Sequence, residues 1–387
     1  MKNSFDRCAQ TEFVLSGLIV CFTILGEGQA VSLCFVASFI VLLLYAGQRS
    51  ISKKYSSLVV LLAILALFNV NLNALISSET IWGFDYFKKV FIFISFVIFL
   101  YFSYTDPVGE RTIRVVRKIP CIAGILLIIS YYFLGNYATY AHGITLGFSN
   151  PNFTGMWLMH IAIYMFIDMT DNEKKPLYRI AISVCFFITS WLIVLTFARS
   201  CLFGLILFVL LCLSRKVFRI DLARKKLFIL AIVITPFLFF VVYQSVVSTE
   251  WFNDVFSFMV SEGKPLTSRK HIWGEAIKAL NNHLILGNYC GISHGTGMAQ
   301  MHNIELDVLC SYGLIPFLLF LNVLYDGCTK TAKEALLDKE YYALCGFLAV
   351  VFSGIFEAGI VAGSMGLNFL TAGLFILANV DRHSSMV

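Results

Sequence analysis

A histidine and an arginine lie in the one long polar stretch of an otherwise apolar chain, residues 246–302. His302 ends this stretch, immediately before a new apolar segment, and Arg269 lies upstream of it. A neutral imidazole can accept a proton from a hydroxyl group, and a guanidinium can bind a phosphate through two parallel hydrogen bonds. The pair therefore suits group transfer from a phosphate-activated lipid.

The residues after His302 predict how its ring is held. Asn303 is a good N-cap for a helix that begins at Ile304, which puts the imidazole at the positive end of the helix dipole. That position favours the neutral ring that a general base needs. Glu305 and Asp307 oppose this effect in part, and their other potential role is to orient the ring. The alternative is a loop histidine that only makes surface hydrogen bonds.

Further cations are candidates for binding an anion. Arg199 interrupts the apolar run 194–202 with no long polar loop around it, and a cation near membrane depth normally faces a polar cavity and a partner. The alternative is a side chain that extends to the outer headgroups. In the polar stretch, Lys264, Arg269 and Lys270 supply the charge that an anionic lipid headgroup needs, or are simply solvated at the surface.

The motif Gly-Phe-Ser-Asn-Pro-Asn at 147–152 precedes an apolar segment that starts at Phe153. Asn-Pro-Asn favours a turn, so we expect Asn152 to cap the following helix, with Asn150 beside it as a supporting residue. Backbone N–H groups there could bind an anion, although a plain capping turn is the alternative. Other polar residues near the outer ends of apolar segments are Asn69, Asn71, Asn73 and Glu357.

The composition places these residues in a membrane. Of 387 residues, 59% are hydrophobic and 13% charged, and the mean hydropathy is +0.81, which excludes an ordinary soluble domain. Apolar runs of about 15 to 23 residues recur, the length that a helix needs to cross the hydrocarbon. We predict a single all-α membrane domain (1–387) with about twelve transmembrane helices. These spans are 12–26, 30–46, 57–76, 90–104, 119–137, 152–168, 180–197, 201–214, 227–245, 303–325, 341–356 and 366–380.

Lysine and arginine positions predict the orientation of the chain. If the N-terminus is cytoplasmic, the inner segments carry 22 of these residues and the outer segments carry 7. Both termini are then inside, and the loop 246–302 with His302 lies on the outer face, between the ninth and tenth spans. We interpret the densest inner loop, 214–226, as a topology anchor at anionic headgroups. The net charge of +6 mostly reflects topology and predicts no nucleic-acid partner.

The outer loop is predicted to contain an amphipathic helix from Ser268 to His283, lying on the membrane or on the bundle. Its apolar residues recur at helical spacing: Ile272, Trp273, Ala276, Ile277 and Leu280. Thr267 or Ser268 could cap it, which puts Arg269 in its first turn. The eleven cysteines show no C-x-x-C spacing and the loop histidines form no metal-binding signature, so we expect no disulfide, metal or cofactor.

Six segments occur in an order that resembles the bacterial O-antigen ligase and polymerase superfamily, over about residues 145–325. They are Gly-Phe-Ser-Asn-Pro-Asn at 147–152, Leu-Thr-Phe-Ala-Arg-Ser at 195–200, Ser-Arg-Lys-His-Ile-Trp at 268–273, Leu-Gly at 286–287, His-Asn at 302–303 and Ser-Tyr-Gly-Leu-Ile-Pro at 311–316. One departure is Ala198, which stands where a hydroxyl residue often precedes the arginine in the family.

The resemblance implies a GT-C-like, metal-independent glycosyltransferase that acts on undecaprenyl-diphosphate-linked glycans at the outer face of the bacterial plasma membrane. His302 would correspond to the family's base, and Arg199 and Arg269 to its two diphosphate-binding arginines. The partners implied are the lipid-linked donor and acceptor, membrane lipids and a chain-length regulator. A diphosphate is already a good leaving group, so electrostatic binding and one base are sufficient, and no carboxylate pair is required.

Two enzymes of this superfamily, and one protein of another class, remain as alternatives. A polymerase joins one lipid-linked repeat to another, whereas a ligase transfers the finished chain to a lipid A core. The Asn-Pro-Asn entry and the compact loop favour the polymerase, for O-antigen or capsule. A secondary transporter would instead show two similar halves and ionisable groups near mid-membrane, whereas the candidate groups here gather at the outer face.

Overall fold

The computed structural model describes residues 4–51, 65, 84–106, 108–135, 139–140, 143–171, 175–246, 266–287, 301–335, 337–362 and 364–379. The predicted span 57–76, with its three asparagines, lies outside these residues except for residue 65. Most of the glycine-rich stretch before His302 also lies outside the described residues, and so does the part of the outer loop that contains Lys264.

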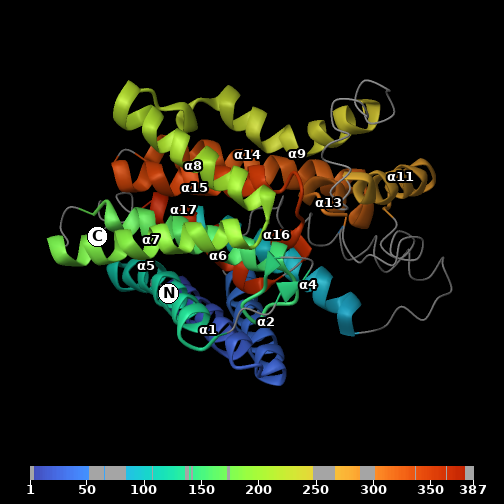
Figure 1. Cartoon of the computed structure of the whole chain (residues 1–387). Helices are drawn as coiled ribbons and strands as arrows, with labels where there is room; N and C mark the ends of the chain where they lie inside the picture. The colour runs from blue at the N-terminus through green and yellow to red at the C-terminus, as the bar shows by residue number, and fades with distance from the viewer. Residues whose placement is uncertain are drawn as a thin grey trace.

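Helices make up nearly all of the described chain (Figure 1). Before the outer loop these are α1 (Ser4–Ile24), α2 (Gly28–Ile51), α4 (Phe84–Thr105), α5 (Glu110–Tyr132), α6 (Pro151–Met169), α7 (Pro176–Leu195), α8 (Arg199–Phe218), the 3₁₀ helix η1 (Leu222–Arg224) and α9 (Lys226–Val246). From the outer loop onward they are α11 (Leu266–His283), α13 (Ile304–Tyr312), α14 (Leu314–Glu334), α15 (Asp338–Ser353), α16 (Gly359–Ala362) and α17 (Met365–Ala378). A two-residue antiparallel pair, β1 (Thr139–Tyr140) and β2 (Gly143–Ile144), precedes α6.

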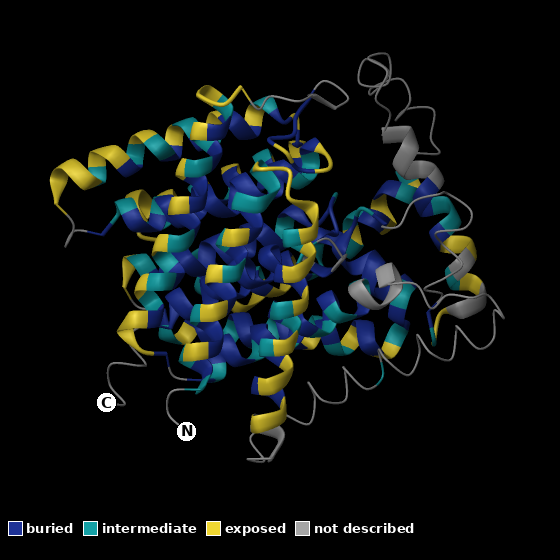
Figure 2. Ribbon diagram, turned by 90° about the horizontal axis from the view of Figure 1, so that it is seen from below, coloured by how far each residue is buried: buried dark blue, intermediate teal, exposed yellow. Residues whose placement is uncertain are grey.

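Five helices of the described chain are long and apolar enough to cross a membrane: α1, residues 28–48 of α2, α7, α8 and α9. Large apolar side chains are exposed on their outer faces, for example Leu44 at 71% and Phe187 at 67%. Figure 2 shows these exposed faces in yellow around a buried interior. So much exposed apolar surface is stable against lipid and unfavourable in water. The structure therefore fits an all-α membrane protein. It supports five membrane-spanning helices among the described residues, and the predicted count of twelve is not shown.

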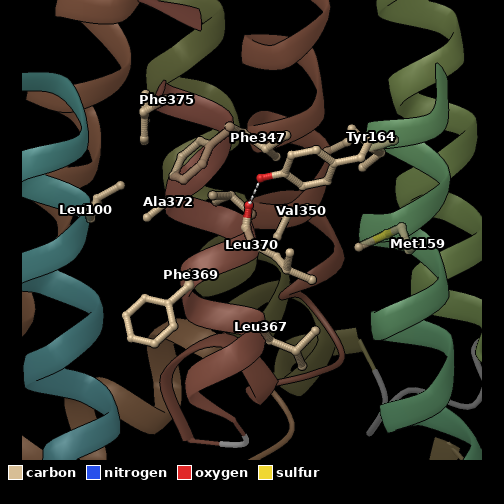
Figure 3. Packing of buried hydrophobic residues seen from close by; sticks show 14 of the residues in the cluster. Leu100, Met159, Tyr164, Phe347, Val350, Leu367, Phe369, Leu370, Ala372 and Phe375 are labelled. Carbon is tan, nitrogen blue, oxygen red and sulfur yellow. Dashed lines mark hydrogen bonds between the residues drawn. The ribbon is translucent and has the colours of Figure 1, made fainter. Parts of the chain in front are cut away.

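The interior of the bundle is packed around α17, every residue of which is buried. Burial on every side identifies α17 as a core helix, because a lipid-facing helix would expose one face. Tyr164 of α6 donates its hydroxyl hydrogen to the Leu370 carbonyl of α17 at 2.7 Å (Figure 3). Phe347 of α15 packs against Phe375 of α17, with ring centroids 4.2 Å apart. These contacts attach α6 and α15, which lead to the candidate site, to one central helix.

The predicted span 303–325 is wrong as a single helix, because the chain breaks at Gly313 between α13 and α14. Gly313 has φ +88°, and a Cβ at this position would overlap the carbonyl of Ile285. The N–H of Leu314 donates to the Leu284 carbonyl at 2.9 Å. The segment that follows α11 therefore packs into the break, and only glycine permits both the positive φ and this close approach.

The packing around α17 predicts that Gly373→Val destabilises the protein. A Cβ at Gly373 would overlap the Phe13 ring and the Tyr164 hydroxyl, both fully buried, so a larger side chain must displace rigid aromatic groups. We expect a loss of about 1–3 kcal/mol, seen as a lower midpoint of thermal unfolding in detergent. Gly47→Val is the control, because a Cβ at Gly47 meets nothing within 4 Å. Equal shifts in the two variants would contradict this account.

Candidate functional site

His302 pairs with Glu357, a residue that the sequence left without a role. The Nδ1 atom of His302 lies 3.4 Å from Oε2 of Glu357. The imidazole is 27% exposed and the carboxylate 5%. A carboxylate at Nδ1 selects the tautomer that carries its hydrogen there, which leaves Nε2 as the proton acceptor. Glu357, rather than Glu305 or Asp307, is therefore the group placed to orient the imidazole.

The backbone around His302 is held in a strained conformation. His302 has φ +50°, the left-handed region that side-chain-bearing residues rarely adopt. The preceding residue, Met301, donates its N–H to Asp307 Oδ1 at 2.9 Å and accepts at its carbonyl from Trp273 Nε1 at 2.8 Å. The N–H of Ile304 donates to the Gly354 carbonyl at 2.9 Å. Fixed groups on both sides keep His302 in this conformation, a feature that recurs at functional sites.

Asn303 caps α13, as the sequence predicts. Its Oδ1 accepts from the N–H groups of Glu305 and Leu306 at 3.1 and 2.9 Å. Its Nδ2 donates to the carbonyls of Pro236 in α9 and Ile355 after α15, at 2.8 and 3.1 Å. Both amide hydrogens are used and the residue is fully buried, so Asn303 joins three segments and has no donor left for a substrate.

Glu305 holds α13 against α9 instead of facing the imidazole. Pro236 lies inside α9, where it cannot donate a backbone hydrogen bond and disturbs the helix. The N–H of the next residue, Phe237, donates to Glu305 Oε2 at 2.6 Å. Oε1 of Glu305 is buried without a hydrogen-bond partner. The expectation that Glu305 orients the His302 ring is therefore wrong, because its carboxylate is directed to the interrupted part of α9.

The amphipathic helix of the outer loop is confirmed as α11, and it packs on the bundle. Its buried residues join one apolar cluster with α9 and α13: Phe240, Tyr243, Ile272, Trp273, Ala276, Met301, Leu306 and Cys310. The rings of Trp273 and Tyr243 meet edge to face, with centroids 4.9 Å apart. Ile277 departs from the predicted apolar face, because it is 36% exposed. Trp273 thus contributes both to this cluster and to the hydrogen bond that holds Met301.

The first turns of α11 contain Arg269 and Lys270. The helix begins at Leu266, so Thr267 and Ser268 lie inside it rather than at its N-cap. The side chains of Arg269 and Lys270 lie outside the described part of the structure. Their role in binding a diphosphate stays a prediction, although their helix contacts α9 and α13 beside His302.

Arg199 is the first residue of α8, directly after a tight turn from α7. Phe197 in this turn has φ +56°, and Thr196 Oγ1 bridges the turn by donating to Ile193 and accepting from the N–H of Ala198. The Arg199 side chain is exposed, and no ion pair or hydrogen bond holds its guanidinium among the described residues. Its charge is therefore available to a ligand.

Asn150, not Asn152, caps α6. Its side chain accepts from the N–H of Phe153 at 2.9 Å, and Pro151 takes the first helical position, so Asn152 lies within the first turn. A proline favours this arrangement, because a backbone N–H at the first helical position has no partner within the helix. Proline, which lacks this N–H, therefore loses no hydrogen bond there. A Cβ on Gly143 would overlap the Thr196 carbonyl, so β2, just before the α6 cap, touches the turn before Arg199.

The starts of α6 and α8 also adjoin the segment that carries Glu357. A Cβ on Gly155 of α6 would overlap the methyl group of Ala198, which explains why a small residue precedes Arg199. A Cβ on Gly359, two residues after Glu357, would overlap the Met156 side chain of α6. His302, Glu357, Arg199 and the α6 cap therefore lie at one end of the bundle, the end toward which α11, α13 and α16 lie in Figure 1.

Lys89 of α4 is a cation that sequence reasoning counted only as an outer charge. Its ammonium acts on the carboxylate of Asp307, and so does His302. The sequence carries a weak signal for it, a lysine directly before the apolar run 90–104. Lys89 therefore adds positive charge on the side of Asp307 that faces α4.

Neither a scan against models of protein families nor a search of curated proteins finds a match to this chain. The superfamily resemblance stays a prediction that rests on the motifs quoted above.

Two asparagine caps predict different costs of substitution. Asn303→Ala removes a cap and leaves two buried carbonyls without donors, which we expect to lower the free energy of unfolding by about 2–4 kcal/mol. Asn150→Ala removes only an exposed cap and should lower it by about 1 kcal/mol. Thermal unfolding of the two purified variants measures the difference. A similar loss in both would show that Asn303 does not join the three segments as described.

Proposed function

We propose that this protein is a glycosyltransferase of the O-antigen ligase and polymerase superfamily. In this proposal it has about twelve membrane spans in a GT-C-like arrangement, with both termini in the cytoplasm. It joins undecaprenyl-diphosphate-linked repeat units into O-antigen or capsular polysaccharide at the outer face of the bacterial plasma membrane. The observation that supports it most is the His302–Glu357 pair at the same end of the bundle as Arg199, whose guanidinium has no protein partner in the described chain.

The proposed reaction begins at the acceptor sugar. Nε2 of His302 removes the proton from an acceptor hydroxyl, and the resulting oxygen nucleophile attacks the anomeric carbon of the donor. The bond from that carbon to the diphosphate oxygen breaks, and its electron pair leaves with the lipid diphosphate. A direct displacement of this kind inverts the anomeric configuration. The imidazolium that forms is stabilised by Glu357 across the Nδ1 contact.

The leaving group needs positive charge, and the candidate site offers it without a metal. Arg199 can bind two diphosphate oxygens at once, and Arg269 of α11 is the second arginine that the resemblance assigns to this task. Donors held in place before the reaction stabilise charge that develops in the transition state with little reorganisation. The start of α8, packed on α6 through Ala198 and Gly155, fixes the backbone from which the Arg199 side chain extends.

A deletion strain tests the proposal directly. Single repeats attached to core indicate a lost polymerase, which is the expected result. Long chains accumulating on undecaprenyl diphosphate indicate a lost ligase and would transfer the proposal to that enzyme. Unchanged glycans in the deletion strain would overturn both.

Variants returned to that strain test the residues. We expect His302→Ala and Arg199→Ala each to abolish chain extension, because one removes the base and the other the diphosphate contact, while membrane insertion stays normal. Arg199→Lys should retain part of the activity, since lysine keeps the charge but not the paired hydrogen bonds. Lys216→Ala, an exposed cation at the other end of α8, is the control and should extend chains normally. Full-length polysaccharide from His302→Ala would show that His302 is not the base.

Glu357→Gln tests whether this carboxylate positions the base. The variant keeps the size of the side chain but weakens its hold on the ring and its support of the imidazolium. We expect kcat to fall roughly ten- to hundredfold with KM nearly unchanged, measured on a synthetic lipid-linked repeat. A larger effect on KM than on kcat would indicate instead that Glu357 contributes to binding the substrate.

A further inference from the structure

A second polar site lies at the opposite ends of α9 and α14 from His302. A cavity of about 290 Å³ opens where η1, the start of α9 and the last turns of α14 meet. Four of the residues that line it are cations, Arg224, Lys225, Lys226 and Lys333, and one is an acid, Asp221. The lining therefore carries an excess of three positive charges.

The only acid that lines this cavity is already neutralised. Asp221 accepts from Arg224 at 3.4 Å and from Arg215 of α8 at 3.3 Å. Arg224 also donates through Nε to the Ala332 carbonyl of α14 at 2.9 Å, which fixes it in the wall. The side-chain ammonium groups of the three lysines have no ion pair or hydrogen bond within the described residues. Three ammonium groups around one cavity repel each other, and an anion bound between them would offset this repulsion.

The position of the cavity separates it from the candidate active site. α14 runs from Leu314, next to the break that follows α13, to the turn that holds Lys333. Nineteen residues of helix rise ~28 Å, about the thickness of the hydrocarbon core. A ligand of this cavity is therefore on the other side of the bundle from His302, on the face that the sequence predicts to be cytoplasmic.

Exposed apolar side chains adjoin the basic cavity. Phe218 ends α8 and is 69% exposed, Ile220 precedes Asp221 and is 47% exposed, and Leu227 follows Lys226 and is 79% exposed. α8 and α9, which carry Phe218 and Leu227, are among the helices able to span a membrane. An amphiphile can place an anionic group in the cavity and its chains on this surface, whereas a small ion would leave the apolar surface uncovered.

We propose that this cavity binds the phosphate of an anionic phospholipid headgroup, with the acyl chains lying against α8 and α9. The three lysines hold the phosphate by charge and hydrogen bonds, and the lipid joins η1, α9 and α14 at the membrane surface. Such a lipid would secure the helix ends that form the far side of the bundle from His302. This binding does not depend on the reaction proposed above.

The test is a titration of the full-length protein in neutral detergent with tail-labelled phosphatidylglycerol, followed by fluorescence anisotropy. Phosphatidylcholine with the same labelled tail and inorganic phosphate are the comparison ligands. We expect phosphatidylglycerol to bind at least about tenfold more tightly than phosphatidylcholine, and millimolar phosphate to displace it by less than about twofold. Equal binding of the two lipids would overturn the proposal. Displacement by submillimolar phosphate would make this a free-phosphate site and overturn the lipid assignment.

Matched variants place the lipid in the cavity. We expect Lys225→Gln, Lys226→Gln and Lys333→Gln together to weaken phosphatidylglycerol binding by about a hundredfold, since each lysine near a lipid surface contributes about one kcal/mol. The control combines Lys216→Gln, Lys330→Gln and Lys339→Gln, which remove the same charge near the same helix ends but outside the cavity. It should change the affinity less than about twofold. Equal losses in the two variants would overturn the proposal.

Two further variants keep the test decisive if the triple glutamine variant does not fold. Lys333→Gln alone changes one exposed residue in the last turn of α14 and should weaken binding about fivefold. Replacement of the three cavity lysines by arginine keeps the charge and should keep the affinity for phosphatidylglycerol. Unchanged binding by Lys333→Gln, or lost binding in a well-folded arginine variant, contradicts the lysine–phosphate contact.

Discussion

The candidate site depends on one buried amide. Asn303 ties the N-terminus of α13 to α9 at Pro236 and to the segment after α15 at Ile355, so three parts of the chain meet at a single side chain. The residue next to it, His302, takes its position from this junction. Buried polar networks of this kind are stable only when every donor and acceptor is used, and the Asn303 side chain meets that condition.

The two ends of the bundle differ in how their charges are compensated. At the end near His302, each carboxylate has a defined contact, with Glu357 at the imidazole and Asp307 at the Met301 N–H, while the Arg199 guanidinium is open to a ligand. At the other end, Asp221 is paired with two arginines, and the three lysines that line the cavity have ammonium groups open to a ligand. Both arrangements leave cations for anionic ligands, one suited to a diphosphate in the proposed reaction and the other to a headgroup.

Some local patterns predicted from the sequence are confirmed, whereas the contacts between distant residues could not be predicted from it. The apolar spacing of α11 and the cap at Asn303 depend on neighbours three or four positions apart, so both could be read directly. The break at Gly313 depends on the close approach of residue 285, and the partner of His302 lies fifty-five residues later at Glu357. Helix length and hydropathy likewise support a membrane protein, but they do not show where an apolar segment is broken into two helices.

The hydrogen bond from Trp273 to the Met301 carbonyl links α11 to the segment that carries His302. Trp273 is buried on α11, and the residue after Met301 is His302, so α11 cannot leave α9 without releasing the backbone that sets the imidazole. The same helix carries Arg269 in its first turn. Assembly of the site is consequently cooperative: the docked helix brings one cation and fixes the histidine together, and an undocked helix loses both at once.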